Sequence, residues 1–446
     1  MISAAIVAMG LLLSGDRLLT DKQQAEAQTD SGPNVVFVMT DDLDERSMEQ
    51  LDGIREVMST NGTTFKNAYV TYSLCCPSRA TILRGQYPHN HQIIGNSLPE
   101  GGEKKFRNLG LDQSTVATWL HDAGYQTKYI GKYMNSYNSL YKPPGWDEWY
   151  VMMGNHWNLS DPTTGKMNDY GQETTLGAHS NDVFAEEASD FIRRSSANQA
   201  PFFVVVGTAA PHAPPHVAER YQDSFVDTPL PRPLNFDEEH IFDKPEWVRS
   251  YSRLSQAEMD EMQTLYRERL RSMLSVEDLL EKIIGTLHQT NELDNTYLFF
   301  TSDNGFHLGN HRLRVTAPMD KKTPYEEDIG VPLMVRGPGV PTEVRQELVI
   351  NNDLAPTIAE LVEVPIPGFV DGRSFAPLLT GSTPYSSRSA FLEEGWFIEE
   401  DILTPTHKSA HTKDHMFTEY ETGEYELYDL KADPLQLESM SRAGNE

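Results

Sequence analysis

Continuous apolar runs at residues 34–40, 202–207, 296–301 and 332–335 constrain the fold of this chain most strongly. They carry no charged residue, which is typical of strands buried on both faces of a sheet. Between them, residues 256–289 repeat apolar side chains at steps of three and four, the pattern of an amphipathic helix. This alternation predicts an α/β sandwich around a large, mostly parallel central sheet.

One large domain with a small appendage is expected from the length. The 446 residues, 38% of them hydrophobic, can bury a sizeable core. We assign residues 28–381 to the main α/β domain and residues 382–446 to a small C-terminal antiparallel subdomain. Short strands are predicted in the latter at residues 389–394, 411–420 and 424–430.

The charge of the chain argues against two classes of partner. Against 37 Lys and Arg it has 66 Asp and Glu, a formal net charge of −29. Such a surface repels nucleic acid and anionic membranes, so neither is expected as a partner. Because it repels an anionic substrate as well, any anion site needs a local basic pocket.

The N-terminus has features of a secretory signal. Residues 4–13 form an apolar run too short to span a bilayer, and residues 25–27 (Ala-Glu-Ala) resemble a cleavage site. We expect residues 1–27 to be a signal peptide and the protein to be secreted or periplasmic. No other segment predicts stable insertion into a membrane.

Oxygen-bearing side chains follow two of the predicted strands. Asp41 and Asp42 come after the first apolar run, and Asp303 and Asn304 come after the third. Ligands of parallel sheets bind beyond the carboxyl ends of the strands, and oxygen donors of this kind suit Ca²⁺ or Mg²⁺ better than Zn²⁺. Such residues also form ordinary turns and helix caps. For either pair alone, a turn or a helix cap is the better interpretation. Two pairs at equivalent strand ends favour a metal site.

A histidine and two lysines occupy further candidate positions. His212 follows the second apolar run in a proline-flanked loop, where an acid or ligand role is favoured over a structural one. Lys132 follows another probable strand, and Lys321 lies in a polar loop. Nothing local distinguishes these lysines from ordinary solvated ones.

The only two cysteines, Cys75 and Cys76, are adjacent. A disulfide between neighbours would be strained, so a reactive or modified cysteine is the better interpretation. Pro77 fits the first turn of a short helix, and Arg79 adds a forked cation near a helix N-terminus, which favours anions. A thiolate is a poor ligand for a hard cation, and this conflict disappears if the cysteine is converted into an oxygen species.

These segments together resemble the type I sulfatases. The signature is Cys75-x-Pro77-Ser78-Arg79 followed by an apolar turn and Gly85, and it is highly specific. The resemblance spans nearly the whole chain after the signal segment. It includes Asp41-Asp42, Gly131-Lys132, Pro211-His212, Ser302-Asp303-Asn304-Gly305, Lys321 with Tyr325-Glu326, and Glu426-Leu427-Tyr428-Asp429-Leu430.

Within that family the chain is most similar to the branch that contains the N-acetylglucosamine-6-sulfatases, the arylsulfatases and the heparan endosulfatases. The motifs behind this are Cys75-Cys76, Pro88-His89-Asn90-His91, Gly131-Lys132-Tyr133-Met134-Asn135 and Pro143-Pro144-Gly145-Trp146. Two positions depart from the family pattern. Many sulfatases have His where this chain has Met134, with Asn135 as a candidate replacement, and relatives often have Arg at Gly330.

The resemblance implies hydrolysis of sulfate esters on an alkaline-phosphatase-like α/β fold. A separate maturation enzyme would oxidise Cys75 to formylglycine, whose hydrate attacks sulfur through one hydroxyl. The other hydroxyl then expels sulfate and restores the aldehyde. The implied substrate is a sulfated carbohydrate or an aryl sulfate.

The resemblance also implies a role for each site residue. One Ca²⁺ would be bound by Asp41, Asp42, Asp303, Asn304 and the converted Cys75. Arg79 and Lys132 would stabilise the modified side chain. His212 and Lys321 would hold the sulfate oxygens, and one of them would protonate the leaving alcohol. Further candidates for lining the substrate pocket are His89, His91, His307 and His311.

Two other functions are compatible with the same residues. One is a phosphodiester or phosphonate hydrolase with the same nucleophile and fold, although Asn304 weakly favours sulfate because a less charged ester needs fewer cations. The other is a non-catalytic sulfoglycan-binding protein with an unconverted Cys75. Every expected catalytic position is filled, which argues against the second.

Overall fold

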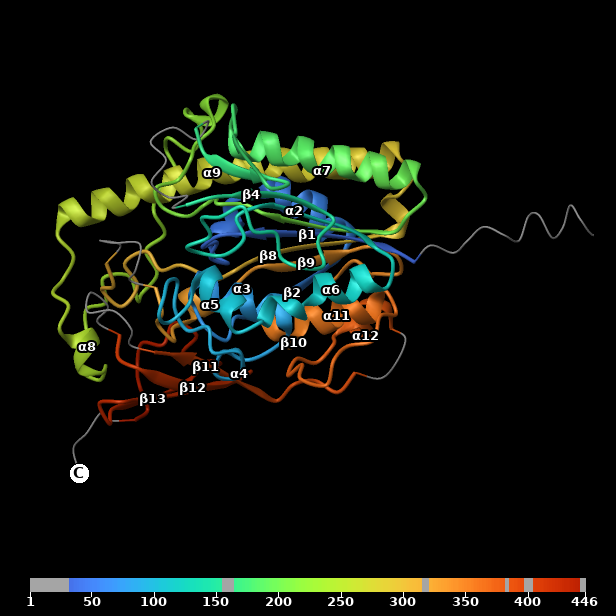
Figure 1. Ribbon diagram of the computed structural model, residues 1–446. Coiled ribbons are helices and arrows are strands. Elements are labelled where there is room, and N and C mark those ends of the chain that lie inside the picture. The colour runs from blue at the N-terminus through green and yellow to red at the C-terminus, as the bar shows by residue number, and fades with distance from the viewer. Residues whose placement is uncertain (1–31, 155–163, 315–320, 382–384, 397–403, 442–446) are drawn as a thin grey trace, which may run out of the picture. The chain divides into compact units, whose positions relative to one another are not determined.

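A computed structural model describes residues 32–154, 164–314, 321–381, 385–396 and 404–441 (Figure 1). Pro33–Glu446 forms one structural unit. The predicted signal peptide, residues 1–27, lies outside the described residues. None of the helices in the described ranges is both long and apolar enough to cross a membrane.

A mixed ten-stranded sheet, most of whose strand pairs are parallel, forms the centre of this unit. Its order is β10-β2-β9-β8-β1-β7-β3-β4-β5-β6. The strands are β1 Asn34–Thr40, β2 Thr63–Tyr69, β3 Gln126–Gly131, β4 Glu148–Met152, β5 Lys166–Asp169, β6 Gln172–Thr175, β7 Phe202–Gly207, β8 Thr296–Ser302, β9 Leu333–Arg336 and β10 Glu343–Ile350. The predicted α/β sandwich with a mostly parallel sheet is confirmed.

Burial of β1 on both faces explains its uninterrupted apolar sequence. Phe37 and Met39 belong to the hydrophobic core on one side of the sheet, and Val36 and Val38 to the core on the other. Each fully buried side chain of this size stabilises the fold by about 1.5–3 kcal/mol. The sheet therefore needs a helical layer on each face.

The helices supply those two layers (Figure 1). On one face α2, α7 and α9 pack together, and on the other α3, α6 and α11 do so. The predicted amphipathic helix coincides with α9, which begins after a capping box formed by Ser255 and Glu258. The helices are α2 Asp52–Met58, α3 Cys75–Arg84, α4 Pro88–His91, α5 Gly102–Asn108, α6 Val116–Asp122, α7 Ser180–Ala197, α8 Glu246–Arg249, α9 Gln256–Gln289, α10 Glu326–Ile329, α11 Leu354–Leu361 and α12 Ala376–Thr380.

A separate four-stranded antiparallel sheet lies near the C-terminus, as predicted. Its strands are β11 Ala390–Gly395, β12 His407–Thr412, β13 His415–Tyr420 and β14 Tyr425–Asp429, in that order. The single strand predicted at residues 411–420 is wrong, because a tight turn divides it. There the Thr412 hydroxyl accepts hydrogen bonds from the backbone N–H groups of Asp414 and His415. The domain boundary at residue 381 stays a prediction.

Candidate active site

Four neighbouring strands bring six of the predicted site residues to one edge of the sheet. The strands β8, β1, β7 and β3 are adjacent and parallel, so their carboxyl ends lie together. Asp41 and Asp42 follow β1, and Asp303 and Asn304 follow β8. The backbone N–H of Asp42 donates to Oδ1 of Asp303 at 3.1 Å, which joins the two strand ends directly.

Cys75 is the first residue of α3 and points at these carboxylates. Its Sγ lies 3.4 Å from Oδ1 of Asp41 and 4.0 Å from Oδ1 of Asp42. The thiol is fully buried, and burial raises its pKa, so little reactive thiolate exists near neutral pH. The next backbone N–H, that of Cys76, donates to Oδ1 of Asn96 at 3.0 Å.

Three buried cations each pair with one carboxylate. Lys132 donates to Oδ2 of Asp41, and Lys321 donates to Oδ1 of Asp42. Nε of Arg79 donates to Oδ2 of Asp303 at 2.7 Å. A second guanidinium nitrogen of Arg79 donates to the carbonyl oxygen of Lys132 at 2.6 Å. These bonds tie helix α3 to the ends of β3 and β8.

Burial and neighbouring charges oppose each other in the pKa values of these groups. Burial alone would raise the pKa of Asp41, but the surrounding cations, Lys132 foremost among them, together outweigh burial and hold that pKa well below its usual range. Burial, together with the charge of Asp41, raises the pKa of Asp303 to about 6. The contrast is expected where several carboxylates crowd one buried site.

The crowded oxygens fit a hard divalent cation. Ligand atoms from Asp41, Asp42, Cys75 and Asp303 lie within 4.8 Å of one another. Oδ2 of Asp42 and Oδ1 of Asn304 are buried, and neither has a hydrogen-bond partner among the described residues. Buried oxygens without donors are costly unless an ion or water binds them. The donor set of three carboxylates and one amide is the kind that Ca²⁺ or Mg²⁺ prefers.

His212 and Lys321 border the cysteine from other elements. Nε2 of His212, in the loop after β7, lies 3.8 Å from Oδ2 of Asp42, and burial lowers the pKa of its imidazole to about 4. Nζ of Lys321 lies 3.6 Å from Sγ of Cys75. Both side chains therefore carry N–H groups close to the position of the predicted nucleophile.

All nine predicted site residues lie in one buried cluster. They are Asp41, Asp42, Cys75, Arg79, Lys132, His212, Asp303, Asn304 and Lys321. The sequence did not point to Asn96, which fixes the start of α3, because a lone asparagine in a loop carries no signal. Three of the histidines suggested as pocket residues are buried and hydrogen-bonded inside the protein: His91, His307 and His311. The fourth, His89, is partly exposed and pairs with Glu394 at 2.6 Å.

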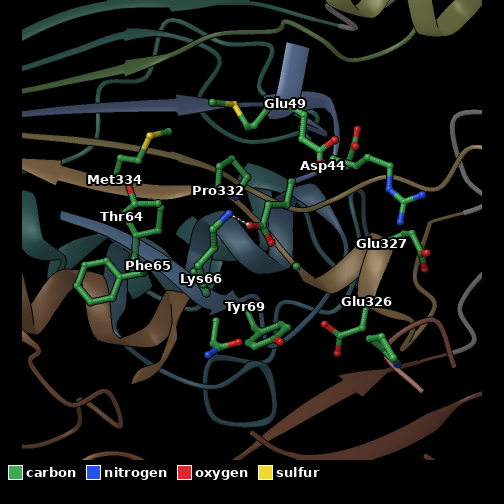
Figure 2. Close-up of a pocket in the computed structure, with 18 of the residues that line it drawn as sticks. Asp44, Glu49, Thr64, Phe65, Lys66, Tyr69, Glu326, Glu327, Pro332 and Met334 are labelled. Atoms are coloured by element: carbon green, nitrogen blue, oxygen red, sulfur yellow. Dashed lines mark hydrogen bonds and ion pairs between the residues drawn. The ribbon is translucent and has the colours of Figure 1, made fainter. Parts of the chain in front are cut away.

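A cavity of about 480 Å³ lies elsewhere, against β2 and β9 (Figure 2). Phe65 and Met334 contribute apolar surface to it, and Glu326 and Glu327 contribute carboxylates. None of the nine site residues lines this cavity. Its size alone therefore does not mark it as the catalytic centre.

Comparison with known proteins identifies the family. The family described as Sulfatase matches residues 33–364, most of the chain. The chain belongs to the sulfatase family. A second family, described as N-sulphoglucosamine sulphohydrolase, C-terminal, matches residues 316–445, which include the small antiparallel sheet.

Named relatives agree with this membership. The N-acetylglucosamine-6-sulfatase of Capra hircus is 37% identical over 389 residues, covering 84% of this chain and 68% of the relative. The human protein of the same name is also 37% identical over 389 residues, covering 84% of this chain and 69% of the relative. This sulfatase is therefore a sulfuric ester hydrolase.

Solved structures agree on the fold. One described as a complex with its substrate D-glucosamine-2-N,6-O-disulfate aligns with a TM-score of 0.79 at 24% identity. The alignment covers 92% of this chain and 93% of the other. The sulfatase fold thus extends over nearly the whole chain, and its sandwich architecture is alkaline-phosphatase-like.

Proposed function

We propose that this sulfatase removes the 6-O-sulfate from N-acetylglucosamine or a related glucosamine unit, with a modified Cys75 as nucleophile. The observation that carries the proposal is the position of Sγ of Cys75. It lies between the carboxylates of Asp41 and Asp42 and the ammonium of Lys321. A metal-bound, cation-flanked nucleophile is suited to attack on an anionic ester.

Two groups would be added to the chain before it is active. Conversion of Cys75 to formylglycine by a maturation enzyme would supply a hydrated aldehyde, whose oxygen is a nucleophile and a hard metal ligand. A Ca²⁺ held by Asp41, Asp42, Asp303, Asn304 and that oxygen would supply Lewis-acid polarisation of the sulfate. The buried, donor-free oxygens of Asp42 and Asn304 support this ligand set.

Two cations of the chain orient the nucleophile. Arg79 lies on the same helix as Cys75, and its bonds to Asp303 and to the Lys132 carbonyl hold that helix against the strand ends. Lys132, paired with Asp41, places positive charge where the ester brings negative charge. Both act by fixed position, because each is fully buried.

The leaving alcohol needs a proton, and two groups can supply it. Nζ of Lys321 and Nε2 of His212 both lie on the Asp42 side of the cysteine. Each can bind sulfate oxygens through an N–H group, and a bound anionic ester favours the protonated form that delivers a proton to the ester oxygen as it leaves. The pair therefore combines substrate binding with acid catalysis.

The glucosamine preference is supported by the named relatives. Two N-acetylglucosamine-6-sulfatases share 37% of their aligned residues with this chain. We infer that the protein is secreted or periplasmic, since homologues include a Drosophila melanogaster protein named as an extracellular sulfatase. A sulfated glycan outside the cell would be its substrate.

Turnover of defined substrates tests the proposal. The enzyme, co-expressed with a maturation enzyme, is assayed on N-acetylglucosamine 6-sulfate, N-acetylgalactosamine 6-sulfate and glucosamine N-sulfate. We expect the first to give the highest kcat/KM. p-Nitrophenyl sulfate is compared with the matching phosphodiester, and faster cleavage of the phosphodiester would contradict sulfate-ester specificity. A preference for another sulfated sugar would contradict only the glucosamine assignment.

A further inference from the structure

One buried carboxylate next to the active site belongs to none of the catalytic roles above. Asp328 lies in α10 (Glu326–Ile329) and is 0% exposed. A buried ionised group is costly unless hydrogen bonds satisfy both of its oxygens. The partners of Asp328 therefore indicate which segments depend on it.

The Oδ2 oxygen of Asp328 binds the loop that carries Lys321. It accepts hydrogen bonds from the Thr323 hydroxyl at 2.6 Å and from the Thr323 backbone N–H at 3.3 Å. Thr323 is two residues after Lys321. Hydrogen bonds to a charged acceptor are stronger than those between neutral groups.

The Oδ1 oxygen binds the loop that follows the metal-site strand. Nδ1 of His307 lies 2.9 Å from it, and the backbone carbonyl of Asp328 accepts from the Gly305 N–H at 2.8 Å. Gly305 directly follows Asn304, one of the proposed metal ligands. Asp328 thus joins the Lys321 loop to the end of β8.

A further contact ties this assembly to the nucleophile. The Ser73 hydroxyl donates to the Thr323 carbonyl at 3.1 Å, and Ser73 lies two residues before Cys75. The backbone of Thr323 is therefore held on one side by Asp328 and on the other by the segment that enters α3. Lys321 extends from this fixed backbone to Asp42 and Cys75.

The backbone beside Lys321 is strained, so hydrogen bonds from its surroundings are needed to hold its conformation. Lys322 has a φ of +96°, in a region that favours glycine. A non-glycine residue in this region is strained and persists only where the surroundings impose the conformation. The hydrogen bonds of Thr323 act on the very next residue.

We propose that Asp328 is a positioning residue for Lys321. By fixing Thr323 against the β8 loop and the entrance of α3, it holds the Lys321 ammonium beside Cys75. The proposal rests on the proposed function in taking Lys321 as the group that contacts the sulfate. Asp328 itself touches neither substrate nor metal.

Kinetics of a double-mutant cycle provide the first test. Asp328→Asn should lower kcat by about 10²-fold, the scale expected for a small misplacement of a catalytic group. In a Lys321→Met background the same substitution should cost almost nothing further, because the group that it positions is gone. An equal loss in both backgrounds would overturn the proposal.

The reactivity of Lys321 provides a test that does not depend on turnover. Acetylation of the folded protein is followed at Lys321 by peptide mass spectrometry, with Lys132 as an internal reference. In the Asp328→Asn variant, Lys321 should be acetylated several-fold faster than in the unchanged protein. Lys132 should be acetylated no faster. Unchanged protection of Lys321 would overturn the proposal even if the sulfatase assay failed, so the two failures are distinguishable.

Matched variants separate positioning from stability. Thr323→Ser keeps the hydroxyl and should preserve kcat, whereas Thr323→Val should lose activity as Asp328→Asn does. Glu393→Gln disturbs another buried pair of carboxylate and histidine, with His407 at 3.2 Å in the C-terminal sheet. It should lower the melting temperature without exposing Lys321. If Glu393→Gln increased the acetylation of Lys321 as much as Asp328→Asn does, the role of Asp328 would be merely structural.

Discussion

At the scale of single residues, the proposed active site is a balanced set of buried charges. The three carboxylates Asp41, Asp42 and Asp303 are each paired with a different cation, so the cluster is close to neutral. Breaking one buried pair leaves an uncompensated charge, which costs about 3–5 kcal/mol.

The choice between His212 and Lys321 as the proton donor can be decided by the leaving group. The sugar alkoxide needs a proton to leave, whereas p-nitrophenolate leaves without one. Loss of the proton donor should therefore reduce kcat by about 10²–10⁴-fold on the sugar sulfate and far less on p-nitrophenyl sulfate.

The measurement is kcat for His212→Ala and Lys321→Ala on both substrates. One variant should lose far more kcat on the sugar sulfate than on p-nitrophenyl sulfate. The other variant should lose a similar factor in kcat on both substrates. Equal losses on both substrates in both variants would mean that neither residue is the acid.

At the scale of elements, close contact between β3 and β7 places Lys132. Gly131 has a φ of +88°, and a Cβ at this position would lie 2.1 Å from the carbonyl oxygen of Gly207. That same oxygen accepts a hydrogen bond from the Lys132 N–H at 2.7 Å. The glycine is therefore required where the lysine leaves the strand.

Gly131→Ala should destabilise the protein by about 3 kcal/mol, from left-handed backbone strain and from overpacking, and should lower kcat because Lys132 is displaced. Gly124→Ala is the matched control, because Gly124 has a φ of +94° but nothing within 4 Å of its Cβ position. It should cost only about 1 kcal/mol. Urea unfolding measures the free energy of unfolding of both variants, and equal losses of stability would refute the packing argument.

Helix α4 contributes a pH-dependent term to stability. Nδ1 of His91 accepts the Ile93 N–H at 3.1 Å, and Nε2 lies 2.9 Å from the Thr81 hydroxyl. Burial, reinforced by the charge of Arg84, lowers the pKa of His91 from 6.5 to about 3. Its neutral form is therefore built into the fold.

Below pH 6.5 the unfolded chain binds a proton that the folded chain excludes, so stability falls as the pH drops from 6.5 to about 3. This histidine adds a slope of at most about 1.4 kcal/mol per pH unit. His91→Gln should remove that slope from the free energy of unfolding. An unchanged slope in His91→Gln would contradict the assignment.

Some of these elements were predictable from the sequence, and others were not. The sequence predicts the strands β1, β7 and β8 and the helix α9, because complete burial or a long amphipathic repeat leaves an unambiguous pattern. The edge strand β10 was not predictable, since its first half alternates exposed and half-buried residues, most of them polar. The turn between β12 and β13 depends on one Thr412 hydroxyl, which periodicity does not reveal.

At the scale of the whole molecule, the site residues come from segments spread over 281 positions, from Asp41 to Lys321. Apolar runs predicted which strand ends would meet, and the cysteine signature predicted the family. Neither could tell which cation pairs with which carboxylate, because that depends on side-chain packing between distant loops. Asp328 was missed for the same reason.

The acidic molecule should depend on calcium for stability as well as for activity. Without the ion, Oδ2 of Asp42 and Oδ1 of Asn304 are buried with no hydrogen-bond partner among the described residues, so chelation should lower the melting temperature and abolish turnover. A ligand present at about 100 times its Kd stabilises a protein by about 3 kcal/mol. Differential scanning calorimetry with and without a chelator measures this. Asn304→Ala should reduce the calcium-dependent shift, and full activity after exhaustive chelation would contradict the metal site.

The central claim is that sulfate esters are hydrolysed by a converted Cys75, and one titration tests it most directly. Preparations with different extents of maturation are assayed for turnover of a sulfate ester, and the aldehyde fraction of the Cys75 peptide is measured by mass spectrometry. Turnover should rise in proportion to the aldehyde fraction and extrapolate to zero without it. Cys75→Ala should be inactive and Cys76→Ala should keep most of its activity. Substantial turnover by protein whose Cys75 is still a thiol would contradict the account.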